Sequence, residues 1–469
     1  MSDNKEVKGR FGWLRDHLPC FNVDGHNITV LHQPNEFYEI FKEMLSNARK
    51  RIVIAALYFD KEEHESALVD AVDAACLRSV QERNEKFEVS ILLDYFRGSR
   101  GGNNSRTQLL PLLNKYKDRV NVYLYHTPHI NGVWRYILPE RVNEMIGLNH
   151  IKIYLVDDDF ILCGGNLGQV YFTIAQDRYM LVKSCQDMSD YFMDLVKTVG
   201  LFSHRLLCDN TTVSPFSDAQ HSDMNEVQSF KKYVNEALTT LNKSWREKQQ
   251  SNVTKDSHYD TFLFPSIQMG PFEVNEDRIV VEKVLRKCEP GDRVIISTGY
   301  LNFPDFLEEC IVNDSVAKFD IITASPQNSG FHGAPSVLEY VPAIYSYFLR
   351  KFHARIVDHN SDRRIRLYEY YKPDKIFHGK GLWYYTSGSC QPALTMIGSS
   401  NFGQRSCYRD LECQITMVTS NIALQSQLKQ EHEKFFENAT MVNQESSKSS
   451  DSYVPWLVSL LASKSRSFF

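Results

Sequence analysis

The stretch NHIKIYLVDDDFILCGGNL, residues 149–167, carries a histidine and a lysine two positions apart and closes with a Gly-Gly-Asn step. The stretch FHGKGLWYY, residues 377–385, followed by LTMIGSSNFG, residues 394–403, repeats this order. In both places an apolar run that predicts a strand leads through a turn to a second strand with a Gly-rich end. The polar residues that the two places share are His150 and His378, Lys152 and Lys380, and Asn166 and Asn401.

The repeat extends to the sequence that precedes each of these stretches. Both halves have a segment with helical periodicity, then a basic turn leading into a β-branched run, then a further strand. These segments are 35–48, 48–60 and 87–96 in the first half and 274–289, 290–302 and 317–325 in the second. Alternating helices and strands indicate βαβ units. We therefore predict an α/β protein of two homologous domains, each with a mixed, mostly parallel sheet flanked by helices.

The two predicted domains occupy residues 1–216 and 261–437. Residues 217–260 between them are polar, and we expect an exposed helical connector there. Residues 438–469 begin with a Ser-rich linker and end in the apolar segment YVPWLVSLLASKSRSFF. That segment suits either a helix docked on the core or a membrane foot that lies in the lipid interface.

The composition is that of an ordinary globular protein. A chain of 469 residues is too long for one compact core, which agrees with two domains. The formal net charge of −5 argues against a general nucleic-acid binder. The ten cysteines are scattered without C-x-x-C spacing, which favours free thiols in a reducing compartment. No apolar run approaches the roughly 18 residues of a membrane span, and we find no signal peptide or clear presequence.

The repeated residues suit chemistry at a phosphodiester. Residues two apart on a strand share a face, so each histidine projects together with its lysine. If the two halves pack face to face, two imidazoles, two ammonium groups and two amides converge at the interface. One histidine can then attack phosphorus and the other can protonate the leaving oxygen, while lysine and asparagine hold the nonbridging oxygens. No metal is needed, because the lysines supply the positive charge.

A nucleophilic histidine needs a partner that holds its other ring nitrogen. Asp177 and Glu412 each lie eleven residues beyond the asparagine of their half, and this equal spacing favours Glu412 over Asp410. The alternative is that these carboxylates belong to salt bridges on the surface.

Further residues could bind phosphate or membrane. The Gly-rich loop RGSRGGNNSR offers a phosphate cradle formed by Arg97, Arg100 and Arg106, although it could equally be a solvated turn. His126 and His129 could line the pocket or serve the core or the surface. Residues 132–141 mix aromatic and basic side chains, which suits either a membrane interface or packing against the domain.

The two His-x-Lys segments resemble the signature of a known superfamily. HIKIYLVD, from His150, fits the H-x-K-x-x-x-x-D signature of the phospholipase D superfamily, with Asp157 as its acid. GGN at Gly164 and GSSN at Gly398 resemble the Gly/Ser–Asn element of that signature and add Ser399 to the expected phosphate contacts. In the second half the position of the acid holds Tyr385, so that signature is incomplete.

The resemblance narrows to the eukaryotic phosphatidylglycerophosphate synthases. It runs from about Trp13 to Gln414 and is carried by LLDYFRGSRGGNNSRTQLLPLL, YHTPH, LPERVNEMIGLNHIKIYLVDDDFILCGGNL, QDRY, PSIQMGPFEV, TGYLNF, FHGKGLWYY and IGSSNFGQRS. It implies transfer of a phosphatidyl group from CDP-diacylglycerol to glycerol 3-phosphate through a phosphatidyl-histidine. We assign His150 as the nucleophile, because its signature is complete, and His378 as its acid/base partner.

The same resemblance implies a setting and partners. It implies a peripheral enzyme of the mitochondrial inner membrane, in contact with an anionic membrane surface and not with nucleic acid. A divalent cation could accompany the cytidine diphosphate, although no metal-ligand cluster is evident. The alternatives are a phospholipase D-type hydrolase acting on lipids or DNA ends, a phosphatidylserine synthase, and an inactive lipid-binding scaffold.

Overall fold

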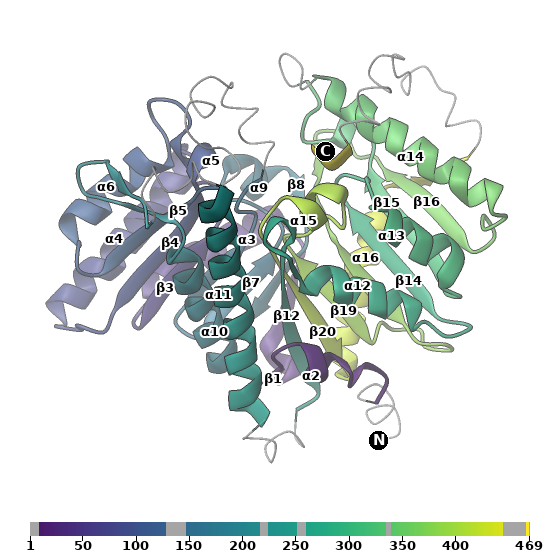
Figure 1. The fold of residues 1–469 in the computed structure, drawn as a ribbon, viewed down its shortest axis with the longest axis horizontal. Coiled ribbons are helices and arrows are strands. Elements are labelled where there is room, and N and C mark those ends of the chain that lie inside the picture. The colour runs from purple at the N-terminus through teal and green to yellow at the C-terminus, as the bar shows by residue number, and fades with distance from the viewer. Residues whose placement is uncertain are drawn as a thin grey trace.

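The computed structural model describes residues 9–127, 147–215, 224–250, 259–333, 339–443 and 466–468. These residues form two large sheets, one for each half of the chain, which stand side by side with helices around them (Figure 1). The sheets meet across a shared apolar core, where β7 (Asp159–Cys163) approaches β19 (Leu394–Gly398). The predicted α/β class with two homologous halves is therefore confirmed.

The first sheet has the strand order β11-β10-β5-β4-β3-β6-β7-β9-β2. Its other strands are β2 (Ile28–Leu31), β3 (Arg51–Ala55), β4 (Glu88–Asp94), β5 (Val120–Tyr125), β6 (Ile153–Val156), β9 (Tyr179–Val182), β10 (His204–Leu206) and β11 (Thr212–Val213). Only β3, β4 and β5 are parallel to one another, and the other neighbours pair antiparallel.

The second sheet repeats this order as β16-β15-β14-β18-β19-β20-β12, with β21 and β1 at its two edges and β13 paired to β12. Its other strands are β1 (Phe21–Val23), β12 (Thr261–Met269), β13 (Val274–Asn275), β14 (Arg293–Thr298), β15 (Lys318–Ala324), β16 (Ile365–Tyr370), β18 (Gly381–Tyr385), β20 (Glu412–Thr419) and β21 (Ala439–Met441). Again only three strands, β14 to β16, run parallel. A further small pairing, between β8 (Ala175–Gln176) and β17 (Ile376–Phe377), joins the two halves.

The expectation of mostly parallel sheets was wrong, for a topological reason. Neighbouring strands are joined by a helical crossover, which parallel neighbours require, only within β3–β5 and β14–β16. The strands that follow each His-x-Lys are joined by short turns, as in β6–β7, and short turns produce antiparallel pairs.

Helices cover the sheets, and some of them begin at a local capping motif. The longer ones are α3 (Pro34–Asn47), α4 (Glu63–Gln81), α6 (Ser105–Lys115), α10 (Gln186–Gly200), α11 (Met224–Gln250), α12 (Glu276–Arg286), α14 (Val341–Asp358) and α16 (Ile422–Phe436). Short ones are α2 (Leu14–His17), α5 (Tyr95–Ser99), α9 (Gln169–Thr173), α13 (Asp305–Glu309), α15 (Gln404–Tyr408), the π-helix η5 (Cys310–Asp314) and the 3-10 turns η1 (Gly25–Asn27), η4 (Gly270–Phe272), η6 (Pro326–Asn328) and η10 (Arg466–Phe468). For example, α3 starts with proline at its first turn and a capping box between Gln33 and Glu36.

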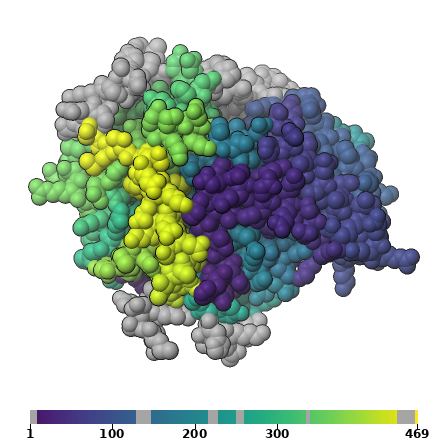
Figure 2. All heavy atoms as spheres, turned by 180° about the vertical axis from the view of Figure 1, so that it is seen from behind, coloured from purple at the N-terminus to yellow at the C-terminus, as the bar shows by residue number. Residues whose placement is uncertain are grey.

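The N-terminal segment crosses to the second half. The helix α2 packs its Leu14 into the apolar core of the second sheet, and β1 pairs antiparallel with β12 at that sheet's edge. The chain then enters the first sheet through β2, whose Val30 N–H donates to Gln427 of α16 at 3.0 Å. Figure 2 shows this arrangement from behind, with the N-terminal region lying along the C-terminal helix. Residues up to Val23, which the sequence division assigns to the first domain, thus contact the second sheet.

The polar connector forms a helix, as expected, but one of its faces is buried. Residues at helical spacing along α11 face the helix α10 and the shared core: Phe230, Val234, Leu238, Leu241 and Trp245. The Nε1–H of Trp245 also donates to Asp194 at 3.1 Å. The connector is therefore an amphipathic element of the core and not an exposed spacer.

A buried arginine ties the two halves together. Arg178, at the start of β9, is fully buried and reaches into the second half, where it donates to both carboxylate oxygens of Glu431 at 3.0 and 2.8 Å. It also donates to Met396 O at 2.6 Å and lies 4.0 Å over the ring of Trp383. A Cβ at Gly381 would come within 1.9 Å of the Arg178 guanidinium, so the glycine leaves the room that this contact needs.

Candidate active site

Both candidate catalytic histidines form a backbone hydrogen bond with the opposite half of the chain. The backbone N–H of His378, just after β17, donates to Gln176 O of β8 at 2.9 Å. In the equivalent place, the backbone N–H of His150 donates to Leu411 O, just before β20, at 2.8 Å. The two hydrogen bonds fix both histidines at the junction between the halves.

The histidine side chains form crossed pairs with the two carboxylates. His150 Nδ1 lies 2.9 Å from Glu412 Oε2 of the second half, and His378 Nδ1 lies 2.5 Å from Asp177 Oδ2 of the first half. Because an ionised carboxylate only accepts hydrogen bonds, Nδ1–H donates in each pair. Nε2 of each histidine therefore has no carboxylate partner, and that of His378 lies 3.2 Å from Lys380 Nζ. Each half therefore supplies the orienting carboxylate for the histidine of the other half.

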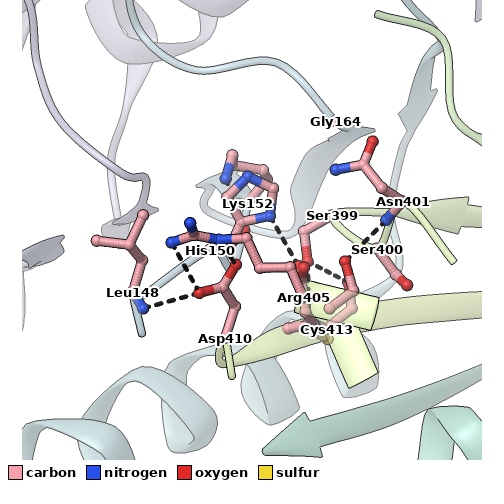
Figure 3. A network of polar contacts seen from close by, with 12 residues as sticks. Leu148, His150, Lys152, Gly164, Ser399, Ser400, Asn401, Arg405, Asp410 and Cys413 are labelled. Atoms are coloured by element: carbon pink, nitrogen blue, oxygen red, sulfur yellow. Dashed lines mark hydrogen bonds and ion pairs between the residues drawn. The ribbon is translucent and has the colours of Figure 1, made fainter. Parts of the chain in front are cut away.

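Asp410, the carboxylate that the spacing argument rejected, has another partner. It accepts hydrogen bonds from the guanidinium of Arg405, at 2.7 Å from Nε, and from the backbone N–H of Leu148 at 2.9 Å. Figure 3 shows His150 and Lys152 of the first half opposite this Arg405–Asp410 pair of the second. The pair was not predicted as part of the site, since its counterparts at the same spacing in the first half are the uncharged Val170 and Ala175.

The two lysines are buried beside the histidines. Lys152 Nζ donates to His150 O at 2.6 Å, and Lys380 Nζ lies 3.0 Å from His378 Nδ1 and 3.4 Å from the Gly164 carbonyl of the opposite half. Burial lowers the pKa of both ammonium groups. Two closely placed cations that lack full solvation are prepared to bind an anionic phosphate.

The asparagines end in the same space. The Oδ1 atoms of Asn166 and Asn401 are buried and make no hydrogen bond with any residue that the structure describes. A buried polar atom without a protein partner carries a free-energy cost, which a bound ligand can relieve. Ser399 differs, because its hydroxyl is engaged with the backbone of Cys413 on β20, donating to O at 3.2 Å and accepting from N at 3.0 Å.

The pKa shifts separate the roles of the two histidines. Burial and Lys152 lower the pKa of His150 well below its usual value, so this imidazole is neutral at physiological pH. Burial and Lys380 lower the pKa of His378 as well, but Asp177 opposes them. For Asp177, Lys380 and His378 together outweigh burial and lower the pKa, whereas burial raises that of Glu412. Because Asp177 opposes the shift, the pKa of His378 is lowered less than that of His150, which favours His378 as the acid and His150 as the neutral nucleophile.

Asp157 does not lie with these residues. It follows β6, whereas His150 precedes it, so about seven residues of extended chain, or some 20 Å, separate the two. Its carboxylate accepts the backbone N–H groups of Arg49, Lys50 and Arg51 at 2.6 to 3.1 Å and so closes the turn that leads into β3.

The second half closes the equivalent turn differently. Asp292 lies within the turn itself and accepts the N–H groups of Glu289 at 2.6 Å and Ser387 at 2.9 Å. Tyr385, at the position of the motif's acid, instead contacts His432 through its hydroxyl. The replacement of the acid by tyrosine therefore changes how a turn is held, and it leaves the residues around His378 in place.

Replacing Asp157 with alanine is expected to lower the free energy of unfolding by about 1–3 kcal/mol, because three backbone donors lose their acceptor. The kcat/KM for phosphatidyl transfer should stay within about twofold of wild type, since Asp157 contacts neither histidine. Asp157→Asn, which keeps one acceptor oxygen, should fall between the two in urea denaturation. A loss of kcat as large as that of a histidine variant, with stability unchanged, would contradict this structural role.

The three arginines of the predicted phosphate cradle do not share one set of contacts. Arg97 lies 4.3 Å over the ring of Tyr58, on the side of the site where Tyr171 packs on His378 with 5.1 Å between ring centroids. Arg106 points elsewhere, since its guanidinium is held by Asn210, with Nε 3.1 Å from Oδ1. Arg100 follows the end of α5 and is half-buried. The contact of Arg97 with Tyr58 thus connects this arginine to the site.

Other predicted residues lie apart from the histidines or outside the described residues. His126 packs against Tyr95 and Phe96, with ring centroids 5.0 and 4.8 Å away. His129, residues 132–141 and most of the C-terminal apolar segment lie outside the described residues. None of the helices described is long and apolar enough to cross a bilayer.

One group among the described residues could hold a metal ion, and it lies outside this arrangement. Asp24, His26 and Asp260 bring ligand atoms within 4.8 Å of one another near η1, and the first two are exposed. Among the described residues, this group shares no hydrogen bond or ion pair with the histidines or lysines of the site.

The chain is similar to curated proteins over most of its length. No family model matches it. The human mitochondrial CDP-diacylglycerol–glycerol-3-phosphate 3-phosphatidyltransferase is 39% identical over 454 residues, which covers 92% of this chain and 81% of the relative. The chicken protein of the same name is 36% identical and covers 98% and 86%, and the Saccharomyces cerevisiae protein is 31% identical and covers 88% and 82%.

Among solved structures, phosphatidylserine synthase from Haemophilus influenzae has the same fold. It superposes with a TM-score of 0.70 over 98% of this chain and 97% of its own, at 18% identity. Sequence identity to the curated relatives reaches well beyond the His-x-Lys segments and covers both halves with their junction. The chain belongs to the family of CDP-diacylglycerol–glycerol-3-phosphate 3-phosphatidyltransferases.

Proposed function

We propose that this protein transfers the phosphatidyl group of CDP-diacylglycerol to glycerol 3-phosphate through a phosphatidyl-histidine at His150, giving phosphatidylglycerophosphate and CMP. The family supports the overall reaction. The observation that carries the mechanism is the pair of crossed histidine–carboxylate contacts, which leave Nε2 of His150 to attack phosphorus and Nε2 of His378, 3.2 Å from Lys380 Nζ, to exchange a proton. The same product would be the first intermediate on the route to phosphatidylglycerol and cardiolipin.

In the first step, Nε2 of His150 attacks the phosphorus that bears diacylglycerol. The P–N bond forms as the P–O bond to CMP breaks, and His378 donates a proton to the leaving phosphate oxygen. Lys152 and Lys380 balance the charge on the nonbridging oxygens, and the Nδ2–H groups of Asn166 and Asn401 donate hydrogen bonds to them.

In the second step, a hydroxyl of glycerol 3-phosphate attacks the same phosphorus. His378, now neutral, accepts the hydroxyl proton while the P–N bond breaks and its electron pair returns to His150. Glu412 accepts the Nδ1–H of His150 throughout and keeps the reacting nitrogen aimed at phosphorus. No metal or organic cofactor enters this sequence of steps.

The test is an assay of the full chain with CDP-diacylglycerol in mixed micelles, with and without glycerol 3-phosphate. We expect phosphatidylglycerophosphate and CMP in equal amounts, and little CMP without the acceptor. If CMP were released at the same rate with and without glycerol 3-phosphate, the protein would instead be a hydrolase. Consumption of serine in place of glycerol 3-phosphate would identify a phosphatidylserine synthase, whose fold this chain shares.

The relatives named for the mitochondrion support a mitochondrial location. We extend this to peripheral attachment at the inner membrane, because the donor is a membrane lipid, and to contact with its anionic surface. The net charge of −5 speaks against nucleic acid as a partner.

The pH dependence of kcat/KM should have two limbs with separate origins. Burial raises the pKa of Glu412, so activity should fall on the acid side at a pH above the range of an ordinary glutamate, as the carboxylate loses its charge. Burial lowers the pKa of Lys152, so activity should fall on the basic side well below the range of an ordinary lysine. Pre-steady-state rates across the pH range measure both limbs.

Two variants assign these limbs, and a third serves as the control. Glu412→Gln should remove the acid limb and Lys152→Arg the basic limb, each with a lower maximum. Asp177→Asn should lower the maximum without moving the acid limb, because the pKa of Asp177 already lies below its usual value. An acid limb that persists in Glu412→Gln would exclude Glu412 as its source.

A further inference from the structure

The short 3-10 turn η10 (Arg466–Phe468) lies against the second half of the protein. Figure 1 shows this end of the chain next to α15 and close to the junction of the two halves. The guanidinium of its arginine donates to four groups that follow β14: Asn302 Oδ1 at 3.0 Å, Phe303 O, and the carboxylates of Asp305 and Glu308. Asn302 Nδ2 donates in return to Arg466 O at 2.8 Å. The segment 466–468 is therefore held in one place by hydrogen bonds in both directions.

The segment 466–468 contacts two arginines of the α15 region. Arg409, directly after α15, donates to O and Oγ of Ser467, each at 2.9 Å, and its guanidinium lies 3.7 Å over the ring of Phe468. Arg405, within α15, donates to Phe468 O at 3.4 Å. The segment therefore restrains the directions in which both guanidinium groups can point.

The contacts continue from Arg405 to the backbone beside His150. The Asp410 carboxylate accepts from Nε of Arg405 at 2.7 Å and from Nη2 at 3.3 Å. The same carboxylate accepts the backbone N–H of Leu148 at 2.9 Å. Leu411 then pairs with this stretch, donating to Leu148 O at 2.9 Å and accepting from the N–H of His150 at 2.8 Å. A continuous set of polar contacts thus joins the segment 466–468 to the histidine.

The duplication shows that this arrangement is specific to His150. On the His378 side the equivalent donor is Ile376, whose N–H donates to the backbone carbonyl of Ile174 at 3.2 Å. The N–H of Leu148 reaches the side chain of Asp410 instead. In the first half the positions of the two arginines and the aspartate hold uncharged residues: Val170, Ile174 and Ala175. At this equivalent position only the His150 side relies on a side-chain acceptor, so its geometry depends on what fixes that side chain.

We propose that the segment 466–468 positions the nucleophile. By restraining Arg405 and Arg409 it keeps the Asp410 carboxylate on the N–H of Leu148, and so it keeps His150 aligned on phosphorus. Arg466 is a positioning residue, since its contacts lead to His150 only through other side chains. The inference rests on the proposed function, because it takes His150 as the attacking group. Small displacements of reacting groups matter, since about 1 Å can cost about a hundredfold in rate.

The first experiment measures amide hydrogen exchange of the full chain by mass spectrometry in two equivalent peptides, 147–152 and 375–380. Arg466→Met should speed exchange in peptide 147–152 about tenfold or more, because the N–H of Leu148 loses its fixed acceptor. Exchange in peptide 375–380 should stay unchanged, since its hydrogen bonds to the first half are made with backbone carbonyls. Unchanged exchange in peptide 147–152 would overturn the inference.

The second experiment measures steady-state kinetics of the same variant. Arg466→Met should lower kcat about tenfold or more and leave the KM for both substrates within about twofold, because alignment and not binding is lost. Arg466→Lys, which keeps a cation near the same acceptors, should recover part of kcat. A raised KM for either substrate with unchanged kcat would assign the segment to substrate binding and overturn the inference.

A double variant tests whether the two arginines act through one set of contacts. Arg405→Met should lower kcat at least as much as Arg466→Met, because it removes the donor to Asp410 directly. Adding Arg466→Met to Arg405→Met should then cause no further loss beyond about twofold. Losses that multiply would show that the two arginines act independently and would contradict the proposed route.

Arg364→Met is the matched control for a purely structural arginine. Directly before β16, Arg364 donates to three backbone carbonyls: Ala317 O at 3.0 Å, Ile311 O at 2.9 Å and Val312 O at 2.8 Å. Its loss should lower the melting temperature and leave kcat and the exchange of peptide 147–152 unchanged. Arg466→Met should lower the melting temperature less, because Glu308 keeps its ion pair with Arg355 at 3.0 Å and Asp305 is exposed.

The two experiments also separate this inference from the proposed function. If Arg466→Met speeds exchange in peptide 147–152 but the wild-type protein forms no phosphatidylglycerophosphate, the proposed function fails and the positioning contact stands. If the wild-type protein is active and the faster exchange leaves kcat unchanged, the alignment of His150 does not depend on the segment, and the inference is overturned.

Discussion

Replacing His378 with alanine is expected to trap the lipid on the protein. CMP is a good leaving group, so the attack by His150 can proceed slowly without an acid, whereas the glycerol hydroxyl needs His378 as a base. His378→Ala incubated with radiolabelled CDP-diacylglycerol should therefore accumulate a phosphatidyl-histidine. Overall turnover should fall by about 10³-fold or more, the usual loss for a member of such a catalytic unit.

Peptide mapping after a quench at alkaline pH, which preserves the P–N bond, should locate this label at His150. His150→Ala should lose turnover to the same degree and carry no label, and the double variant should be no worse than either single one. Label at His378 in the His150→Ala protein would reverse the roles of the two histidines. Asp157→Asn provides the control that turns over normally and keeps the labelled state transient.

Of the substitutions proposed for this protein, Arg178→Met is expected to lower the free energy of unfolding the most. The change removes a fully buried cation and leaves Glu431 with Trp383 Nε1, at 3.0 Å, as its remaining donor. A buried carboxylate without its cation typically costs about 3–5 kcal/mol, and urea denaturation should show a loss of this size. The His378 side should also lose activity, because Arg178 follows Asp177 directly in the chain.

Two further variants test that explanation. Adding Glu431→Gln to Arg178→Met should recover part of the loss, because the unpaired charge is removed together with its partner. Arg366→Met removes a half-exposed arginine from the buried Asp320, which keeps its ion pair with Arg293 at 2.8 Å, and should cost less than about 1 kcal/mol. If the double variant were as unstable as the sum of the singles, the charge of Glu431 would not be the cause.

Much of the fold could be predicted because its signals are local. The β-branched runs, the turn residues and the two His-x-Lys segments are visible in short windows, and their repetition revealed the duplication. The antiparallel part of each sheet was missed because the strand–turn–strand segment after each histidine was recognised, but the antiparallel pairing that a turn imposes was not carried into the predicted sheet. The place of β1 was also missed, since a three-residue strand carries no signal of which sheet it joins.

The site could be predicted only in part, because sequence spacing does not report which atoms meet. Equal spacing pointed to Asp177 and Glu412, but it could not reveal that each contacts the histidine of the other half. Asp157 and His150 belong to one sequence motif, but the extended strand β6 lies between them. They therefore stand at opposite ends of that strand. Arg106 lies in a basic loop, but its direction depends on Asn210, about a hundred positions later.

The crossed histidine–carboxylate contacts constrain how the gene can change. A substitution of Asp177 acts on His378 of the other half, and a substitution of Glu412 acts on His150, so neither half can diverge without consequences for its sister. In an alignment of homologous sequences, positions 177 and 378 should covary as one pair, and positions 412 and 150 as another. Because both halves belong to one chain, each histidine meets its carboxylate within the same molecule, and the site does not depend on the protein concentration.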